Sequence, residues 1–326
     1  MNSNKEIGTI GVLTSGGDAP GMNAAIRAVV RTALSKGLKV KGIMHGYAGL
    51  LNEEFIDMGM RSVSEIIQRG GTVLYTARCL EFKEMAGVIK AHEICEKNGI
   101  DGLVVIGGDG SFRGAQDLSN VGTPCIGIPG TIDNDIACSE YTIGYDTAMN
   151  TVVEMVDKLR DTANSHSRCS VVEVMGRRAG HIALNTGIAC GAAVILVPEQ
   201  DFDPERDLLA RIRYAQECGK HHFIVMVAEG VGKAEEIAQI IRDNTGIDTR
   251  KTVLGHVQRG GSPTLRDRVV ATQMGYHAVE LLTQNIGNRV VAMKNGEIVD
   301  YEINEALSMK KGIETKLLEI AHCISI

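Results

Sequence analysis

Short apolar runs recur along the chain, and most end in a turn rich in glycine or polar residues. Because these runs are continuous rather than alternating, they are typical of parallel strands that are covered on both faces. The runs expected to form strands are Ile10–Leu13, Val40–Ile43, Leu103–Ile106, Cys125–Ile128, Val171–Val174, Val194–Val197, Phe223–Ala228 and Thr252–Leu254.

Stretches with helical spacing of apolar residues lie between these runs. Ala24–Ser35 places its apolar residues three and four apart, and Gly37 follows as a stop signal. Asp146–Thr162 repeats the pattern. Alternation of strands and helices predicts an α/β, doubly wound fold whose ligands bind at the carboxyl ends of the strands.

Length and composition favour a soluble, two-domain protein of the cytoplasm. The 326 residues are roughly twice the ~150 residues typical of one domain. No run reaches the ~18 apolar residues of a membrane span, and the start MNSNKEIGTIGV lacks the pattern of an export signal. The eight cysteines form no CxxC pair, as expected for reduced thiols. A net charge of −6 gives no general attraction to nucleic acid or membranes.

The segment GGDGS at 107–111 follows a predicted strand and suits phosphate binding. Gly107, Gly108 and Gly110 let backbone N–H groups approach phosphate oxygens, and a helix is expected to begin at Ser111. Asp109 would repel phosphate unless Mg²⁺ lay between them. A plain strand-to-helix turn, with Asp as a turn residue, is the alternative that this pentapeptide alone leaves open.

A second loop, PGTIDND at 129–135, also follows a predicted strand. Asp133 and Asp135 are two residues apart, so their side chains point to the same side if the segment is extended. One carboxylate could then bind a metal while the other takes a proton from an attacking hydroxyl. Thr131 adds a hydroxyl donor for a transferring phosphoryl group. A surface turn with paired Asp residues is the alternative.

Several arginines lie in turns after predicted strands and favour a polyanionic ligand. Arg177 and Arg178 follow the strand SVVEV, and Arg259 lies with His256 in TVLGHVQRGGSP. Arginine pairs with phosphate through two donors, although a solvated surface position is the ordinary alternative for each. Glu229, after FIVMVA, suits a sugar hydroxyl or a helix cap. The loop TSGGDAPGMN at 14–23 is not GxGxxG, which disfavours dinucleotide binding.

Six segments in order over nearly the whole chain resemble the bacterial, ATP-dependent 6-phosphofructokinases. They are IGVLTSGGDAPGMNAAIR (10–27), RGGT (69–72), VVIGGDGS (104–111), PGTIDNDI (129–136), VEVMGR (172–177) and TVLGHVQRGGSP (252–263). The resemblance implies two Rossmann-like, three-layer domains with mainly parallel sheets. It implies a larger ATP- and Mg²⁺-binding domain at 1–144 plus 258–308 and a smaller fructose 6-phosphate-binding domain at 145–257 plus 309–326.

The implied activity is phosphorylation of fructose 6-phosphate at its 1-hydroxyl by ATP, the committed step of glycolysis. By this resemblance Asp133 takes the hydroxyl proton, Thr131 and Arg177 stabilise the transferring phosphoryl group, and Gly17 is a backbone donor. Asp109 holds Mg²⁺ with Asp135 nearby. The implied ATP site is Gly17, Tyr47, Arg78, Cys79, Gly108, Asp109, Gly110 and Ser111, with Arg78 bridging the phosphates of the two substrates.

The implied sugar site extends across a subunit boundary. Within one chain it comprises Thr131, Asp133, Asp135, Met175, Gly176, Arg177, Glu229, His256 and Arg259. Arg168 and Arg250 match positions that reach the 6-phosphate from a neighbouring subunit, so the resemblance implies an oligomer, typically a homotetramer. An effector site for ADP or phosphoenolpyruvate is implied at Arg27, Arg31, Arg160, Gly191 and Lys220.

Four positions separate this sequence from parts of the family. Gly110 and Gly130 stand where pyrophosphate-dependent relatives carry Asp and Lys, so ATP is expected as the donor and pyrophosphate is the alternative. Ala193 replaces a Glu associated with the effector's Mg²⁺, and Cys218 replaces a basic residue. Losing a charged contact to phosphate typically costs ~1.5–3 kcal/mol. An altered effector response is therefore expected, unless neighbouring residues compensate.

Overall fold

A computed structural model of the protein describes residues 7–324. Residues 1–6, which begin the segment judged for an export signal, and residues 325–326 lie outside the described part. The chain divides into two compact units. The large unit is Met1–Ile132, Ile136–Asp146 and Arg259–Lys311, and the small unit is Asp133–Asp135, Thr147–Gln258 and Gly312–Ile326. None of the described helices is long and apolar enough to cross a membrane.

The large unit is built on a seven-stranded sheet with the order β11-β10-β5-β4-β1-β2-β3. The central strands β10, β5, β4, β1 and β2 run parallel, and the edge strands β3 and β11 are antiparallel to their neighbours. The strands are β1 (Thr9–Thr14), β2 (Lys39–Ile43), β3 (Phe55–Asp57), β4 (Gly102–Gly107), β5 (Cys125–Pro129), β10 (Arg289–Lys294) and β11 (Glu297–Glu302).

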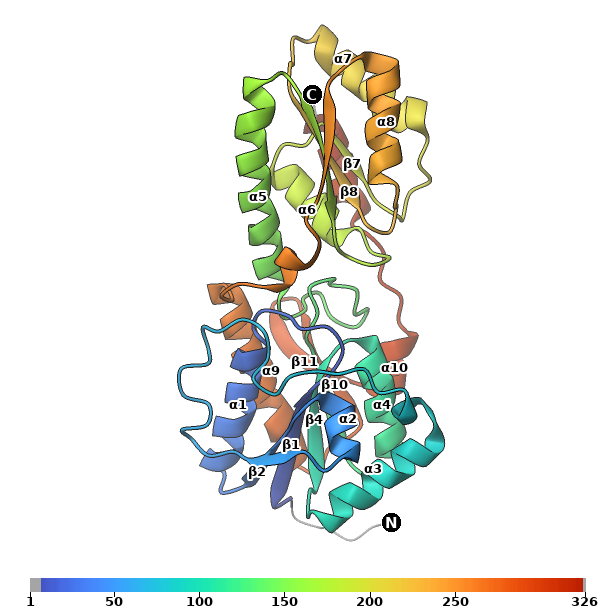
Figure 1. The fold of residues 1–326 in the computed structure, drawn as a ribbon. Helices are drawn as coiled ribbons and strands as arrows, with labels where there is room; N and C mark the ends of the chain where they lie inside the picture. Colours follow the sequence, from blue (N-terminus) through green and yellow to red (C-terminus); the bar gives the residue numbers. More distant parts are fainter. Residues whose placement is uncertain (1–6, 325–326) are drawn as a thin grey trace. The chain divides into compact units, whose positions relative to one another are not determined.

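Helices cover both faces of this sheet (Figure 1). Helices α1 (Met22–Ser35) and α9 (Leu265–Thr283) pack together on one face. The other face carries α2 (Gly46–Leu51), a 3-10 helix (Glu81–Lys83), α3 (Met85–Lys97), α4 (Asp109–Asn120) and α10 (Ile303–Ser308). Burial of apolar strand residues on both faces explains why the strands read as unbroken hydrophobic runs.

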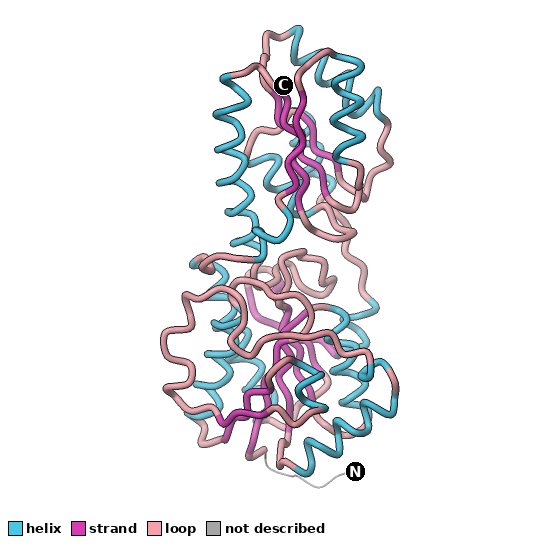
Figure 2. The backbone as a smooth tube through the Cα atoms, in the orientation of Figure 1, coloured by secondary structure: helices cyan, strands magenta, loops and turns pink. Residues whose placement is uncertain are grey.

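The small unit has a four-stranded parallel sheet with the order β7-β8-β6-β9. Its strands are β6 (Cys169–Val174), β7 (Val194–Leu196), β8 (Phe223–Ala228) and β9 (Thr249–Val253). Figure 2 shows helices on both sides of these strands. The helical elements are α5 (Tyr145–Ser165), α6 (His181–Ala189), a π-helical turn (Pro204–Leu209), α7 (Ala210–Glu217), α8 (Ala234–Thr245), a 3-10 helix (Gly255–Arg259) and α11 (Thr315–Ile324).

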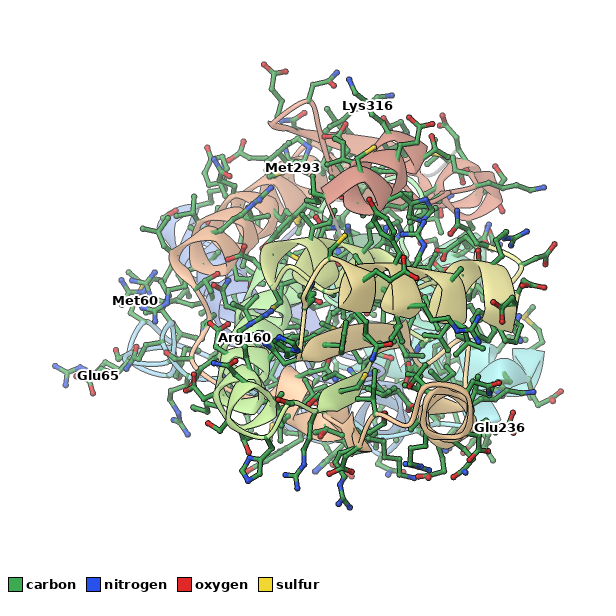
Figure 3. All side chains as sticks on the ribbon, turned by 90° about the horizontal axis from the view of Figure 1, so that it is seen from above. Met60, Glu65, Arg160, Glu236, Met293 and Lys316 are labelled. Atoms are coloured by element: carbon green, nitrogen blue, oxygen red, sulfur yellow. The ribbon has the colours of Figure 1, made fainter. Side chains whose placement is uncertain are left out.

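These observations confirm the predicted α/β class with helices on both faces of mainly parallel sheets. The hydrophobic cores use Ile, Val, Leu, Ala and Cys, with few aromatic rings. Charged side chains such as Glu65, Glu236 and Lys316 point outward from the ribbon (Figure 3).

Candidate active site

Three of the predicted loops meet at the carboxyl edge of the large sheet. They follow β1, β4 and β5, which are adjacent strands. The amide of Ser15 donates to the carbonyl of Ile106 at 2.9 Å, and the amide of Gly130 donates to the carbonyl of Gly107 at 2.9 Å. The Ser111 hydroxyl donates to the Ser15 carbonyl at 3.1 Å. Ser15 and Ser111, which are 96 residues apart in the sequence, are therefore joined by a direct hydrogen bond.

The glycines of GGDGS have two different physical roles. A Cβ atom on Gly107 would lie 2.4 Å from the Ser15 carbonyl oxygen, so only glycine fits this close approach of two loops. A Cβ atom on Gly108 or Gly110 would meet nothing within 4 Å. These two positions instead border open space, which is what phosphate oxygens near the backbone require.

Helix α4 begins at Asp109, two residues before the predicted start at Ser111. The predicted start of this helix was two residues too late. The N-cap residue is Gly108, whose carbonyl accepts hydrogen bonds from the amides of Ser111 and Phe112. Asp109 therefore lies in the first helical turn, where the helix dipole favours a negative charge.

Tyr47 occupies a buried position beside α4. Its hydroxyl donates to the Ser111 carbonyl at 2.7 Å, and its ring stacks on Phe82 with 4.0 Å between centroids. Burial raises the pKa of Tyr47 well above its usual value, so this hydroxyl remains a donor. Sequence reasoning missed Phe82, whose only signal was its place just after Arg78 and Cys79.

Gly17 lies beneath Arg259. A Cβ atom at Gly17 would lie 2.5 Å from the Arg259 Nη1, and this Nη1 donates to the Asp18 carbonyl at 3.1 Å. Loop 14–23 and the QRGG turn therefore meet within the large unit. The guanidinium contributes positive charge directly beside the predicted backbone donor.

The loop PGTIDND bends where an extended segment was expected. Asn134 has φ 51°, in the left-handed region, a conformation that Asn tolerates well. The condition under which Asp133 and Asp135 would point to the same side, an extended chain, is therefore not met. Asp133 is fully buried, whereas Asp135 is half-buried. The two carboxylates thus occupy different environments.

In the small unit, Arg177 lies next to Asp133. Its Nε is 3.3 Å from Asp133 Oδ2, and the side chains are 60% and 0% exposed respectively. Arg177 has φ 54°, an uncommon conformation for a non-glycine residue. Backbone strain of this kind persists only where surrounding contacts hold it.

Glu229 holds the Arg177 backbone. Its Oε1 accepts hydrogen bonds from the amides of Gly176 at 3.2 Å and Arg177 at 2.5 Å. These backbone contacts give Glu229 a structural role besides the sugar contact and the helix cap considered from sequence. A second residue that sequence reasoning missed is the buried Gln258, whose Oε1 accepts from the Met175 amide at 3.2 Å.

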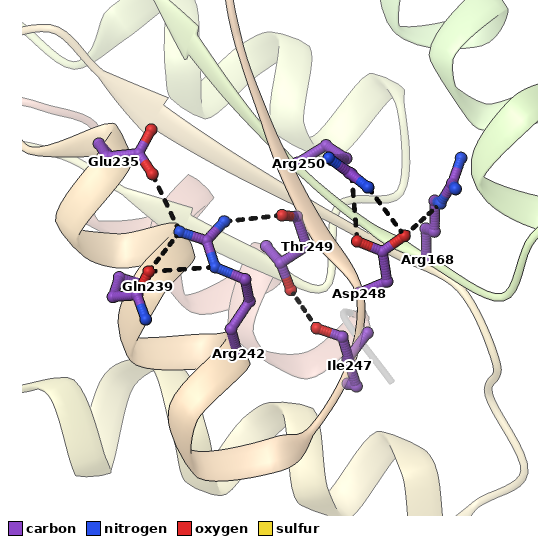
Figure 4. A network of polar contacts seen from close by, with 8 residues as sticks. All are labelled: Arg168, Glu235, Gln239, Arg242, Ile247, Asp248, Thr249 and Arg250. Atoms are coloured by element: carbon purple, nitrogen blue, oxygen red, sulfur yellow. Dashed lines mark hydrogen bonds and ion pairs between the residues drawn. The ribbon is translucent and has the colours of Figure 1, made fainter.

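Arg168 and Arg250 share one carboxylate (Figure 4). Asp248 lies 2.6 Å from Arg168 Nε and 3.1 Å from Arg250 Nε. The hydrogen bond from Arg168 is the main cause that lowers the pKa of Asp248. Asp248 therefore stays charged and leaves this cluster with a net positive charge.

His256, in the 3-10 helix after β9, is exposed.

The predicted site residues divide between the two units. The large unit carries Gly17, Arg27, Arg31, Tyr47, Arg78, Cys79, Gly108, Asp109, Gly110, Ser111, Thr131 and Arg259. The small unit carries Asp133, Asp135, Arg160, Arg168, Met175, Gly176, Arg177, Gly191, Lys220, Glu229, Arg250 and His256.

Comparison with known proteins decides the family. The phosphofructokinase family model matches residues 9–282. The chain belongs to the phosphofructokinase family. It is 58% identical over 317 residues to the "ATP-dependent 6-phosphofructokinase" of Clostridium botulinum (strain Loch Maree / Type A3), covering 97% of this chain and 99% of the relative. It is 58% identical over 322 residues to the protein of the same name from Caldanaerobacter subterraneus subsp. tengcongensis, with 98% and 99% coverage.

Solved phosphofructokinase structures share the fold. The phosphofructokinase of Saccharomyces cerevisiae superposes with a TM-score of 0.88 at 34% identity over 98% of this chain. This chain spans 48% of that yeast chain, about half of its length. The pyrophosphate-dependent phosphofructokinase of Marinobacter aquaeolei has a TM-score of 0.84 at 23% identity, over 95% of this chain and 86% of that chain.

The predicted effector residues include two pairs of neighbouring basic side chains, Arg27 with Arg31 in the large unit and Arg160 with Lys220 in the small unit. The Nε of Arg31 is buried and has no hydrogen-bond partner in the described structure. Burial lowers the pKa of Arg27, and the neighbouring Arg31 lowers it further. Burial likewise lowers the pKa of Lys220, with Arg160 adding to the shift. Groups that are desolvated and repel one another gain stability from a bound anion.

The predicted effector positions of the small unit differ in burial. Arg160, labelled in Figure 3, donates to the Cys190 carbonyl just before Gly191, which has φ 57°. Ala193 is buried in the hydrophobic core of the small unit, whereas Cys218 is exposed at the end of α7.

Proposed function

We propose that this protein transfers the γ-phosphoryl group of ATP to the 1-hydroxyl of fructose 6-phosphate, giving fructose 1,6-bisphosphate and ADP. The reaction is the committed step of glycolysis, and a cytoplasmic location accords with it. The observation that carries this proposal is the near-full-length identity of 57–58% to relatives named ATP-dependent 6-phosphofructokinase.

Asp133 is the proposed base, and Arg177 is its partner in the chemical step. A buried carboxylate is shielded from water and can accept the proton of the 1-hydroxyl as oxygen attacks the γ-phosphorus. The Arg177 Nε lies 3.3 Å from the Asp133 carboxylate, which supports the proposal that its guanidinium stabilises negative charge on the transferring group. Thr131 and the Gly17 amide are proposed as further donors to that group.

Asp109 and Asp135 are the residues proposed to hold Mg²⁺. Magnesium is usually bound by one or two carboxylates together with waters and substrate phosphates. The ion would neutralise phosphate charge and orient the γ-phosphoryl group.

We propose that the large unit binds ATP and the small unit contributes most of the sugar site. Tyr47, Arg78, Cys79, Gly108, Gly110 and Ser111 form the proposed nucleotide site with Gly17 and Asp109. Met175, Gly176, Glu229 and His256 are proposed to hold fructose 6-phosphate, together with Arg259 of the large unit. Arg168 and Arg250, oriented by Asp248, would reach the 6-phosphate of a neighbouring subunit in a homotetramer.

ATP rather than pyrophosphate is the proposed donor. The open space at Gly110 leaves room for an α-phosphate and a nucleoside. The pyrophosphate-dependent structures share only 20–23% identity with this chain. The test is a coupled assay of fructose 1,6-bisphosphate formation with each donor in turn. Faster turnover with pyrophosphate would refute the donor assignment, and no turnover with either donor would refute the activity.

We further propose an altered response to phosphoenolpyruvate or ADP. The Ala193 methyl group belongs to the hydrophobic core and cannot replace a carboxylate. Cys218 supplies no positive charge at pH 7 where a basic residue would. Arg27, Arg31, Arg160, Gly191 and Lys220 are the remaining proposed effector residues.

A further inference from the structure

The segment 141–144 lies alongside the loop that carries Thr131. Ile143 forms a parallel β-bridge with Gly130, and its amide donates to the Pro129 carbonyl at 2.9 Å. The hydroxyl of the fully buried Thr142 donates to the Thr131 carbonyl at 2.6 Å. The backbone before the proposed base is thus fixed by two successive residues of one neighbouring segment.

Asp267, at the start of α9, holds this segment from the other side. Its Oδ1 accepts hydrogen bonds from the Tyr141 hydroxyl at 2.5 Å and the Gly144 amide at 2.7 Å. The Arg266 guanidinium covers the Tyr141 ring at 4.5 Å. Burial, followed by the charge of Asp267, raises the pKa of Tyr141 far above its usual value, so its hydroxyl stays protonated and donates.

The space around the segment leaves it little freedom. Gly144 has φ 101°, and a Cβ atom there would lie 2.7 Å from the Cβ of Ala19. The segment is therefore packed against loop 14–23, which contains the proposed backbone donor Gly17. A small rotation of residues 141–144 would move the Thr131 backbone with it.

We propose that Thr142, held in place through Asp267, is a positioning residue for phosphoryl transfer that acts through Thr131. This inference rests on the proposed function, in which Thr131 stabilises the transferring phosphoryl group. Removing the Thr142 hydroxyl takes the 2.6 Å donor from the Thr131 carbonyl, and the loop is then free to shift from its wild-type position. Misplacement of a catalytic group by about 1 Å can lower the rate by ~10²-fold. Thr142 itself is not proposed to touch either substrate.

The decisive variant is Thr142→Val, which keeps the shape of the side chain and removes the donor. We expect kcat to fall by ~10-fold, within the range that positioning can control, while KM for ATP and for fructose 6-phosphate changes by less than about twofold. Thr142→Ser retains the hydroxyl and is expected to restore at least about half of the wild-type kcat. If Thr142 only stabilised the fold, its loss would not lower kcat while leaving KM nearly unchanged, and Thr142→Ser would not recover kcat in this selective way.

Thr186→Val is the matched control. Thr186 is equally buried, and its hydroxyl also donates to a backbone carbonyl, that of Ile182 at 2.7 Å. It lies inside α6 and is not among the residues proposed for catalysis. This variant should keep the wild-type kcat even if its melting temperature falls as far as that of Thr142→Val.

Tyr141→Phe provides a second, independent measurement if Thr142→Val does not fold. It keeps the ring beneath Arg266 and removes only the donor to Asp267, and we expect a ~3-fold lower kcat with unchanged KM values. The proposal is overturned if a folded Thr142→Val, or in its absence Tyr141→Phe, keeps the wild-type kcat, or if Thr186→Val loses as much. Absence of turnover in the wild-type protein would instead refute the proposed function.

Discussion

Gly110→Asp tests whether one position in the GGDGS loop keeps the nucleotide site open to ATP. Gly110 lies in the first turn of α4, its φ is not positive, and an added Cβ atom meets nothing within 4 Å. The variant should therefore fold without strain. An acidic residue in the first turn of a helix typically stabilises the helix by ~0.3–1 kcal/mol. The melting temperature of Gly110→Asp should therefore equal or exceed that of the wild type.

The expected loss is electrostatic. A carboxylate about 5 Å from a phosphate oxygen costs about 1 kcal/mol at the dielectric constant of water and about 3 kcal/mol at an effective value of ~20. The kcat/KM for ATP should accordingly fall by a factor between ~5 and ~150. KM for fructose 6-phosphate should change little, because the new charge lies in the proposed nucleotide site.

Gly110→Asn is the matched control, since Asn has nearly the same size and no charge. The assay measures kcat/KM for ATP at saturating fructose 6-phosphate for the wild type and both variants, with thermal unfolding recorded in parallel. Equal losses in the Asp and Asn variants would show that size rather than charge matters. An Asp variant with the wild-type kcat/KM for ATP would refute the reasoning.

Three further predictions concern chemistry, pH and regulation. Asp133→Ser should lower kcat by at least ~10²-fold with an unchanged circular dichroism spectrum, and a near-wild-type rate from a folded variant would contradict its role as the base. Asp300 is 19% exposed; burial raises its pKa, but hydrogen bonds from His277 and Arg289 outweigh this and lower it. Its contribution to the free energy of unfolding is therefore fully present above the unfolded pKa of about 3.9 and is lost as the pH falls through the lower folded pKa. Asp300→Asn should be less stable by ~1 kcal/mol at pH 7, with a difference that shrinks below pH ~4 in urea titrations. Phosphoenolpyruvate, titrated against the fructose 6-phosphate saturation curve, should cause only weak inhibition; strong sigmoidal inhibition at low concentration would contradict the altered effector site.

The strands that position the site could be predicted because they are continuous apolar runs. Strand β8 matches its predicted bounds, whereas β9 begins at Thr249, earlier than predicted, because the exposed Arg250 and Lys251 interrupt its apolar character. The antiparallel strand β11 was not predicted. It lies at the sheet edge and is only partly buried, so charged residues such as Asp300 interrupt its apolar residues.

Residues at strand ends could be proposed from sequence because glycine, Asp and Arg after a strand have a direct chemical meaning. Thr142, Asp267 and Gln258 could not, because their importance depends on hydrogen bonds to segments whose proximity the sequence does not reveal. Tyr141 and Asp267, for example, are 126 residues apart. Such partners become visible only when the fold brings them together.

Loops that bind phosphate through their backbone need support from outside themselves. Glycine at positions such as Gly108 and Gly110 leaves open space beside the backbone, but it also gives the loop the greatest conformational freedom to lose. Flanking contacts restrict that freedom here, through Ser15, Gly107 and Gly130. Because these bonds join parts of the protein to one another, they help to meet the ordering cost on folding rather than at the moment of binding. Substitution of Ser15, Gly107 or Gly130 should therefore lower kcat because the loops would be misplaced, although none of these residues needs to touch a substrate.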